Sequence, residues 1–189
     1  MDDNKIYIKH MVCPRCVMTA RKIFNDCGIT PLNVELGVVT LADPVGGEKL
    51  DELRKSLEEY GFELIDDRRR QIVEQIRVGV IEYVRQPELR EKMNLSQWLC
   101  HKCRRDYSYI SKLYTEINGI SIEKYYIAQR VELVKELLIY GELTVSEIAY
   151  TIGYSSVAHL SAQFKSVTGL SPTQFKQLKH PRISPIDQL

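Results

Sequence analysis

The chain has 189 residues, with 26 Lys and Arg against 25 Asp and Glu, so its formal net charge is only +1. This length allows one large or two small domains, and the overall charge indicates neither a nucleic acid nor an acidic surface as partner. The charge is uneven along the chain, however. Residues 1–66 carry 8 basic and 12 acidic side chains, whereas residues 67–189 carry 18 and 13. The second part is therefore the one suited to contact phosphate.

The sequence has no features of a secreted or membrane protein. It begins Met1-Asp2-Asp3-Asn4 without an apolar signal region, and no apolar run approaches the roughly 20 residues that span a bilayer. Five cysteines are an odd number and do not suggest a secreted disulfide framework. We therefore expect a cytoplasmic protein with no membrane partner, in which the thiols are normally reduced.

Strand and helix patterns alternate over residues 1–66. The order is βαββαβ within about 65 residues, which is the order of the ferredoxin-like split βαβ fold. The expected elements are a strand at 5–9, a helix at 17–27, strands at 33–36 and 38–41, a helix around Leu50–Leu57 and a closing strand at 62–65.

Two cysteines lie between the first strand and the first helix, in the run Met11-Val12-Cys13-Pro14-Arg15-Cys16. Two thiolates at the start of a helix can converge on one soft ion, and the positive helix end lowers their pKa. Thiolates favour Cu(I) or Zn(II), although Zn(II) needs two further ligands. Cys13 and Cys16 are therefore a candidate metal site. Two alternatives stay open, a pair of cysteines that has lost its ligand and a redox-active dithiol.

The cysteine motif, together with Tyr60-Gly61-Phe62 before the last strand, resembles the heavy-metal-associated domain, the fold of small copper chaperones. The resemblance covers residues 5–66 and implies a ferredoxin-like fold in which the two cysteines are the metal ligands. Pro14 and Arg15 depart from the small or polar residues that this family usually has between the cysteines. The alternative is a domain of the same fold that mediates dimerisation or binds a partner without metal.

A helical stripe follows this domain, with apolar residues at Ile72, Ile76, Val80 and Tyr83. It predicts a connector helix within residues 67–90, which ends at the break around Gln86-Pro87-Glu88. The last nine residues, 181–189, form a proline-broken tail.

One pattern of apolar residues, glycines and serines occurs twice between Asp106 and Lys176, fifty residues apart. Each copy predicts a short helix that ends at a glycine and is followed by a serine cap for the next helix. A second pair of matching segments precedes it, with an offset along the chain that is shorter by one residue. Each copy therefore consists of a helix, a tight turn and a capped helix, which is the plan of a helix-turn-helix. In that pairing Leu99, Cys100 and Cys103 correspond to Ile148, Ala149 and Ile152.

The runs Asp106–Tyr114 and Gly119–Ser121 resemble the first half of an AraC-type DNA-binding domain, and Val145–Tyr154 and Thr168–Pro172 resemble its second half. The resemblance covers about ninety residues, 91–180, and implies two helix-turn-helix units joined by one long helix. A generic helical bundle would share the apolar stripes but not the matched glycines and caps. The predicted fold class is therefore α+β, a ferredoxin-like domain followed by an all-α double helix-turn-helix domain.

The second helix of each unit would lie in the major groove of DNA, with its first turns against base edges. Because both units lie on one chain, a monomer can engage successive grooves about 34 Å apart, and a closer spacing of the helices predicts DNA bending. His159 lies at the edge of the base-facing side. The predicted base-facing residues are Tyr107, Ser108, Ser111, Lys112, Ser156, Val157, Ala158 and Ser161, and the predicted phosphate contacts are Arg104, Arg105, Arg130 and Lys165.

The sequence therefore predicts a bacterial transcription regulator that binds double-stranded DNA, has no catalytic residues, and senses a soft metal through Cys13 and Cys16. A homodimer and RNA polymerase are the candidate further partners. The alternatives are a regulator whose first domain acts without metal and a metal carrier with a helical docking module. Cys27, Cys100 and Cys103 are predicted to belong to the core, because the last two match buried positions of the second copy.

Overall fold

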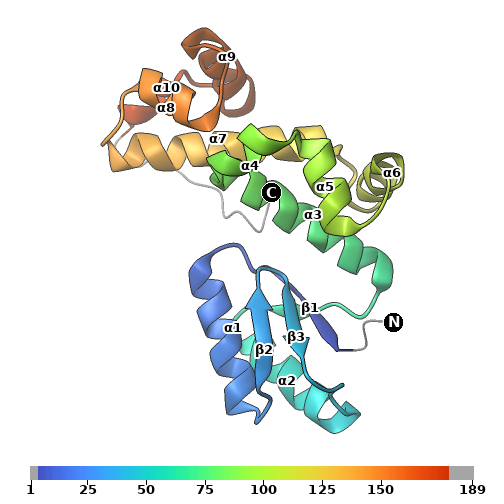
Figure 1. The fold of residues 1–189 in the computed structure, drawn as a ribbon. Helices are drawn as coiled ribbons and strands as arrows, with labels where there is room; N and C mark the ends of the chain where they lie inside the picture. Colours follow the sequence, from blue (N-terminus) through green and yellow to red (C-terminus); the bar gives the residue numbers. More distant parts are fainter. Residues whose placement is uncertain (1–3, 179–189) are drawn as a thin grey trace. The chain divides into compact units, whose positions relative to one another are not determined.

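The computed structural model describes residues 4–178 of the chain (Figure 1). The chain divides into two compact units, Met1–Val78 and Gly79–Leu189. The division falls inside helix α3 (Arg68–Arg85), which together with α4 (Pro87–Lys92) occupies the predicted connector. The predicted tail lies outside the described residues. Of the helices that residues 4–178 form, none combines the length and the apolar composition that crossing a bilayer requires.

The N-terminal unit contains a small antiparallel sheet and two helices that pack on it and on each other. The strand order is β2-β3-β1-β4, so the first strand lies between the third and the fourth. The elements are β1 (Lys5–Lys9), α1 (Pro14–Asp26), β2 (Pro31–Glu35), β3 (Val38–Leu41), α2 (Gly47–Glu59) and β4 (Glu63–Leu64), which is the predicted order of elements.

Several boundaries in this unit differ from the predicted ones. Strand β2 runs over Pro31–Glu35 rather than 33–36. Helix α1 begins at Pro14 rather than at residue 17, because proline at the first helical position loses no hydrogen bond. Strand β4 has only two residues, where four were predicted. Its residues pair with Ile8 and Lys9, and a further bond from the Ile65 amide to the Tyr7 carbonyl, at 2.9 Å, continues the ladder.

The core of the N-terminal unit gathers apolar side chains from all of its strands and from both helices. Ile8, Met11, Phe24 and Leu57 are fully buried there. Gly37, between β2 and β3, has φ +74, and a Cβ at this position would lie 2.9 Å from a methyl carbon of Val78 on α3. Any other residue would therefore meet both backbone strain and a steric clash.

Glu74, on the part of α3 that belongs to the N-terminal unit, is only 5% exposed. Burial raises the pKa of this carboxyl, while the charges of Arg77 and Lys9 act in the opposite direction. The folded state therefore binds this proton more tightly than the unfolded chain does. The stability that the proton contributes is complete below the ordinary value of 4.5 and is lost as pH rises through the raised pKa.

We expect Glu74→Gln to remove this loss of stability. Urea denaturation at a series of pH values should show that the wild type loses stability above about pH 4.5, relative to the variant, until the carboxyl has ionised. The exposed Glu58, changed in the same way, is the control and should follow the wild type, because it is not among the charges that act on Glu74. Parallel profiles for the wild type and Glu74→Gln would contradict the prediction.

The C-terminal unit is helical, and one long helix, α7, runs through it. In Figure 1, α6 lies near one end of α7, and α8, α9 and α10 lie near the other. Helix α5 packs against α6, and α8 packs against α9. Helix α7 contacts both α6 and α9. The bounds are α5 (Leu95–Cys103), α6 (Tyr107–Asn118), α7 (Ile122–Tyr140), α8 (Val145–Ile152), α9 (Val157–Thr168) and α10 (Pro172–Lys176).

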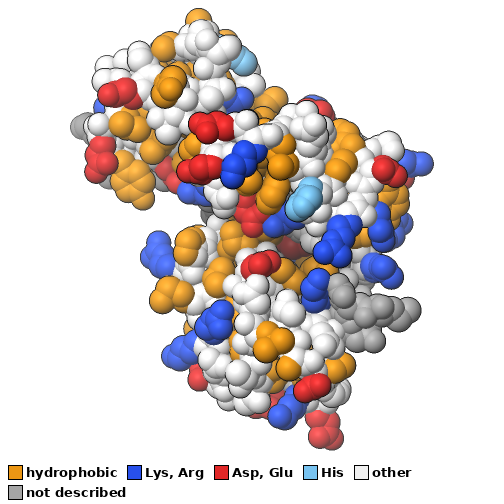
Figure 2. Space-filling model, in the orientation of Figure 1, with side chains coloured by type: hydrophobic (Ala, Val, Ile, Leu, Met, Phe, Trp, Pro, Cys, Tyr) orange, Lys and Arg blue, Asp and Glu red, His pale blue; other side chains and the backbone are white. Residues whose placement is uncertain are grey.

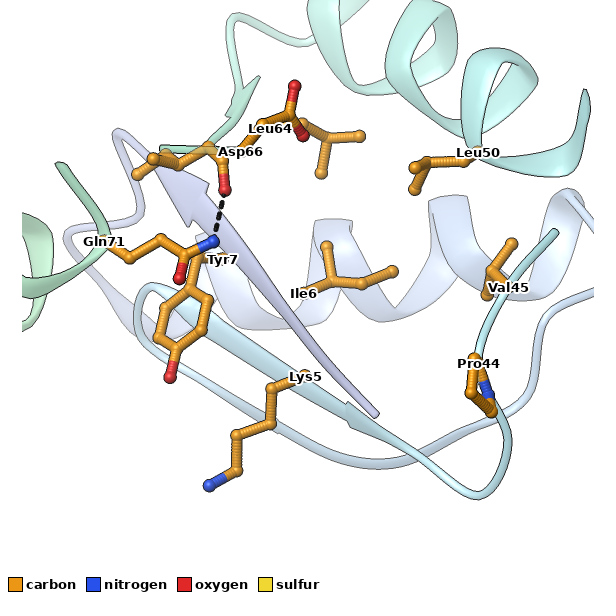
Figure 3. Close-up of a pocket in the computed structure, with 10 residues that line it drawn as sticks. Lys5, Ile6, Tyr7, Pro44, Val45, Leu50, Leu64, Asp66 and Gln71 are labelled. Atoms are coloured by element: carbon orange, nitrogen blue, oxygen red, sulfur yellow. Dashed lines mark hydrogen bonds between the residues drawn. The ribbon is translucent and has the colours of Figure 1, made fainter. Parts of the chain in front are cut away.

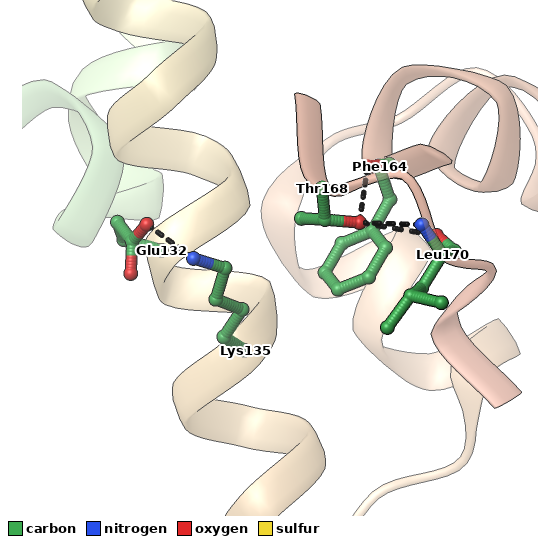
Figure 4. A network of polar contacts seen from close by, with 5 residues as sticks. All are labelled: Glu132, Lys135, Phe164, Thr168 and Leu170. Carbon is green, nitrogen blue, oxygen red and sulfur yellow. Dashed lines mark hydrogen bonds and ion pairs between the residues drawn. The ribbon is translucent and has the colours of Figure 1, made fainter. Parts of the chain in front are cut away.

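Helix α7 is buried on several sides, and this burial includes charged residues. Lys135 and Glu132 are 8% and 3% exposed, and Lys135 Nζ lies 2.6 Å from Glu132 Oε1 (Figure 4). Three residues along a helix bring two side chains to the same face, so that each charge neutralises the other within the core. In the same view, the Thr168 hydroxyl at the end of α9 donates to the Phe164 carbonyl at 2.8 Å.

Candidate nucleic-acid interface

Each of the two helix pairs is a helix-turn-helix, and the two turns differ in length by one residue. The first turn is 104–106, between α5 and α6, and the second is 153–156, between α8 and α9. Both turns begin in the left-handed region, at Arg104 with φ 50 and at Gly153 with φ 78. The extra residue in the second turn accounts for the slip between the two pairings in the sequence.

The second helices, α6 and α9, have 12 residues each and begin fifty residues apart, at Tyr107 and Val157. Their buried faces correspond, since Ile110 and Tyr114 of α6 stand where α9 has Leu160 and Phe164. Both helices end at a glycine with positive φ, as predicted. The two helices therefore present the same face outwards.

The eight predicted base-facing residues lie on this outward side. Four of these residues lie on α6 and three on α9, and each of the seven is exposed or half-buried. Ser156 is exposed at the N-cap of α9. None of them is buried in the packing of the helices. The exposed members are Ser108, Lys112, Ser156, Val157 and Ala158, and the half-buried members are Tyr107, Ser111 and Ser161.

The predicted base-facing side of α6 carries two polar contacts to acidic residues. The Tyr107 hydroxyl donates to Glu123 Oε1 at 3.5 Å, and its pKa is raised by burial and by the charge of this carboxylate. Lys112, whose side chain is 80% exposed, lies 4.0 Å from Glu116 one turn further on. An exposed pair at this distance is weak, so Lys112 is free to exchange Glu116 for a phosphate or a base.

The start of α9 is fixed by its own turn. Ser156 caps the helix by accepting a hydrogen bond from the His159 amide at 3.0 Å. His159 Nδ1 lies 3.0 Å from the Ser155 hydroxyl, and its ring meets the Tyr154 ring edge-on at 5.4 Å. The Tyr154 hydroxyl donates to Gln163 Oε1 at 2.9 Å. The sequence did not assign a role to Tyr154 or Gln163.

The predicted phosphate contacts fall into two groups. Arg104 and Arg105, in the first turn, and Lys165, on α9, are exposed. Arg130 is only 8% exposed, and its guanidinium lies 3.6 Å above the Tyr154 ring. The structure therefore corrects the prediction for Arg130, because its side chain is held inside the helical packing and not on the surface.

Helix α7 joins the two helix-turn-helix units. With 19 residues it is roughly 28 Å long, at the usual rise per residue. Successive major grooves on one face of straight DNA lie about 34 Å apart. On the face of the C-terminal unit that Figure 2 shows, Lys and Arg side chains are interspersed with hydrophobic and acidic ones, in line with the modest net charge.

The cysteine loop of the N-terminal unit brings two thiols together. Cys13 is the N-cap residue of α1, and its Sγ lies 3.4 Å from the Sγ of Cys16. Partial burial raises the pKa of Cys13, but hydrogen bonds from Cys16 and the Arg15 backbone, with the Arg15 charge, outweigh it and lower the pKa. Burial raises the pKa of Cys16. Within residues 4–178, no group of three His, Cys, Asp or Glu side chains is placed to hold a metal ion.

The remaining cysteines lie apart from this loop. Cys27 and Cys100 are half-buried, and the Cys27 thiol donates to the Ser56 hydroxyl at 3.6 Å. Cys103 is 7% exposed, and burial raises its pKa to about 12, although the charge of Lys102 acts in the opposite direction. Thiolate, and not thiol, is the reactive form, so Cys103 is an inert core residue.

Alkylation should distinguish Cys103 from the thiols of the loop. We expect iodoacetamide at pH 8 to modify Cys13 while Cys103 stays unmodified, because a thiol with a pKa of about 12 carries almost no thiolate at that pH. Peptide mass spectrometry measures both positions, and denaturation in urea should expose Cys103 to the reagent. Equal labelling of the two cysteines in the folded protein would show that Cys103 is accessible and ionised.

A cavity of about 250 Å³ opens beside β1 in the N-terminal unit (Figure 3). Ile6, Val45 and Leu50 form part of its apolar wall. The polar groups at its edge are already engaged, since the Gln71 amide donates to the Ile65 carbonyl at 2.8 Å and Asp66 pairs with Arg54 at 2.9 Å. We assign no ligand to this cavity.

The comparisons with known proteins concern the helical part of the chain. The family described as "Helix-turn-helix domain" matches residues 99–178. The C-terminal domain of AraT, a response regulator from Geobacillus stearothermophilus, is a similar solved structure, with 26% identity and a TM-score of 0.50 over 59% of this chain and 88% of that one.

Three curated relatives are similar to about half of the chain. The uncharacterized HTH-type transcriptional regulator YdiP of Escherichia coli is 35% identical over 88 residues, 47% of this chain and 29% of YdiP. The Msm operon regulatory protein of Streptococcus mutans is 28% identical over 90 residues, 48% of this chain and 29% of that protein. AdaA of Bacillus subtilis, a bifunctional transcriptional activator and DNA repair enzyme, is 26% identical over 99 residues, 52% of this chain and 46% of AdaA.

The chain thus spans less than a third of the length of the first two of these relatives. The family match covers residues 99–178, in which most of the two helix pairs and of the predicted helix-turn-helix motifs lie. Residues 99–178 thus match the helix-turn-helix domain family, in agreement with the paired helices of this segment.

Proposed function

We propose that the protein is a transcription regulator that binds a specific double-stranded DNA sequence through α6 and α9. The observation that carries this proposal is the pair of equal helices, each behind a short turn, with corresponding faces exposed and α7 between them. The names of the relatives support it, since they are transcriptional regulators. RNA polymerase and a second copy of the chain are the further partners that such a regulator would have.

In this mode of binding, each of the two helices occupies one of two successive major grooves. We take the length of α7, roughly 28 Å, as the separation of α6 and α9, which is shorter than the distance of about 34 Å between successive grooves of straight DNA. The DNA would therefore bend towards the protein, and the cost of bending would depend on the sequence between the two half-sites. Val157 and Ala158 can contact only apolar base atoms such as the thymine methyl, which makes DNA shape a larger part of recognition by α9.

Selection of duplexes from a random pool with the full-length chain tests the proposal. We expect one recurring site with two half-sites about one helical turn apart. Affinity for this site, measured by fluorescence anisotropy at two salt concentrations, should fall as salt rises, and end-labelled energy transfer should show a bend. Binding that is weak, independent of salt and equal for all sequences would exclude the function.

For the N-terminal unit, we propose a ferredoxin-like fold of the heavy-metal-associated type in which Cys13 and Cys16 bind a soft metal as the signal. The sheet order and the 3.4 Å distance between the two sulfurs support this proposal. Two thiolates suit two-coordinate Cu(I), whereas Zn(II) would need ligands from outside the described residues. Met11 contributes no ligand, because it is fully buried in the core.

The double variant Cys13→Ser/Cys16→Ser tests the metal proposal, with Cys27→Ser as the matched control. We expect Cu(I) to bind the wild type and the control but not the double variant, and to change the affinity for the selected duplex only where it binds. If the double variant regulates like the wild type, the unit acts in dimerisation or partner binding. Transfer of Cu(I) to an acceptor protein without any DNA binding would indicate a metal carrier.

A further inference from the structure

The guanidinium of Arg130 is buried between two aromatic rings. Its Cζ lies 3.6 Å from the ring centroid of Tyr154 and 5.4 Å from that of Tyr126. The side chain extends from α7, and the residue is 8% exposed. Two of its nitrogens, Nε and Nη2, have no hydrogen-bond partner within the described part of the chain.

A cation in this position is costly. A buried donor without an acceptor loses its hydration with no replacement, and a charge loses more than a neutral group. An apolar side chain of similar length would fill the same space without this loss. The attraction between the cation and the faces of the tyrosine rings offsets part of the cost, and this attraction has a defined geometry. The contact therefore fixes the position of Tyr154 more narrowly than apolar packing would.

Tyr154 is the residue through which this contact reaches α9. It lies in the turn of the second helix-turn-helix, with its amide bonded to the Ala149 carbonyl at 2.8 Å. From there its hydroxyl donates to Gln163 on the second turn of α9, and its ring meets the ring of His159 on the first turn edge-on. One ring thus contacts α9 at two points along the helix.

The first helix-turn-helix has no such contact in the corresponding place. Tyr154 stands two residues after the end of α8, and the residue two places after the end of α5 is Arg105, which is exposed. Arg90 adds a second support to the second unit only, since its Nη2 donates to the Thr151 carbonyl near the end of α8 at 2.7 Å. The support of the second turn is therefore specific to that copy.

We infer that Arg130 is a positioning residue for DNA recognition, which acts through Tyr154 to set the orientation of α9 on its half-site. The inference rests on the proposed function, because it assigns α9 to one half of a two-part DNA site. It places the effect of Arg130 on the second half-site alone. The first half-site, bound by α6, is independent of it.

The experiment compares Arg130→Met with the wild type on the selected duplex and on two versions in which either half-site is scrambled. We expect the penalty for scrambling the second half-site to shrink about tenfold in Arg130→Met, equal to about 1.4 kcal/mol, while the penalty for the first half-site is unchanged. Arg85→Met is the matched control, since Arg85 contacts α7 through Glu136 and not Tyr154. This control should retain both penalties.

A double-mutant cycle with Tyr154→Leu separates positioning from general stability. If Arg130 acts through Tyr154, the double variant loses no more half-site discrimination than either single variant. Additive losses, or equal losses at both half-sites, would overturn the inference.

Hydrogen exchange supplies a readout that needs no DNA. Arg130→Met should speed exchange of the His159 and Leu160 amides in the first turn of α9, and leave that of Ile110 in α6 unchanged. Uniform acceleration across the unit would show a structural role only and overturn the inference. Absence of wild-type binding to any duplex would instead remove the proposed function, and the exchange result would still decide whether Arg130 positions α9.

Discussion

A glutamate at Ser108 or at Ala158 is expected to weaken binding to the selected duplex by about 100-fold, equal to about 2.7 kcal/mol, without loss of stability. These two residues are the second residues of α6 and α9, and both are exposed. A carboxylate there would face the bases and phosphates and repel them. At the same time, a negative charge in the first turn of a helix is favourable, so the melting temperature should stay the same or rise.

Thr173→Glu is the matched control for both substitutions. Thr173 is the exposed second residue of α10, and α7 already has a glutamate at the corresponding position, Glu123. Anisotropy titrations and thermal denaturation of the three variants give binding and stability separately. A binding loss in the control equal to that at Ser108 or Ala158 would mean that charge, and not the predicted groove-facing position, decides the effect.

Phe164→Ala is expected to destabilise the C-terminal unit by about 3–5 kcal/mol, a large part of the stability of a typical domain. Phe164 is fully buried, and its ring meets Phe175 of α10 edge-on at 5.5 Å. Removal of the ring would leave a cavity between α9 and α10 and loosen the cap at Ser171. Urea denaturation followed by circular dichroism measures the change in the free energy of unfolding.

Val167→Ala serves as the control on the same helix, because Val167 is 47% exposed. Its loss should stay below about 1 kcal/mol, since most surface substitutions have small effects. If Phe164→Ala were as mild as this control, the rings of Phe164 and Phe175 would not be part of a well-packed core, and the packing described for α9 and α10 would be wrong.

The helix ends of the C-terminal unit could be predicted because their signals are local. Gly119 and Gly169 end α6 and α9, and Ser121 and Ser171 cap the helices that follow. Such signals depend on residues three or four places apart, so no knowledge of the tertiary structure is needed. The capping box at Asn94 and Gln97 was missed, although it has the same local form, because no repeat drew attention to it.

Features that depend on contacts between distant residues could not be predicted. Asp106 occupies the N-cap of α6, where aspartate is a favoured residue, but its side chain accepts no capping hydrogen bond. Arg130 was predicted to lie on the surface, but tertiary packing buries its guanidinium against the Tyr154 ring. A helix that is buried on several sides has no polar face from which the exposed residues could be inferred.

The candidate DNA-binding residues could be predicted better than their partners. A position off the apolar stripe of a short amphipathic helix is exposed almost by necessity, which applies to Ser108 and Lys112. The side chains that hold these helices in place are different, since they come from α7 and from the turns. The hydrogen bond between Tyr154 and Gln163 could not be predicted from the sequence, because the two side chains come together only in the folded turn.

The single additional residue in the second turn limits how the two halves of the domain can be exchanged. A chimera that replaces α5–α6 by α8–α9 at a uniform offset of fifty residues would bring in one residue too many between its two helices relative to the original. The inserted segment would also move Tyr154 to the first turn, away from the guanidinium of Arg130 that it contacts in the second turn. The two helix-turn-helix units are thus not interchangeable, although their second helices have the same length.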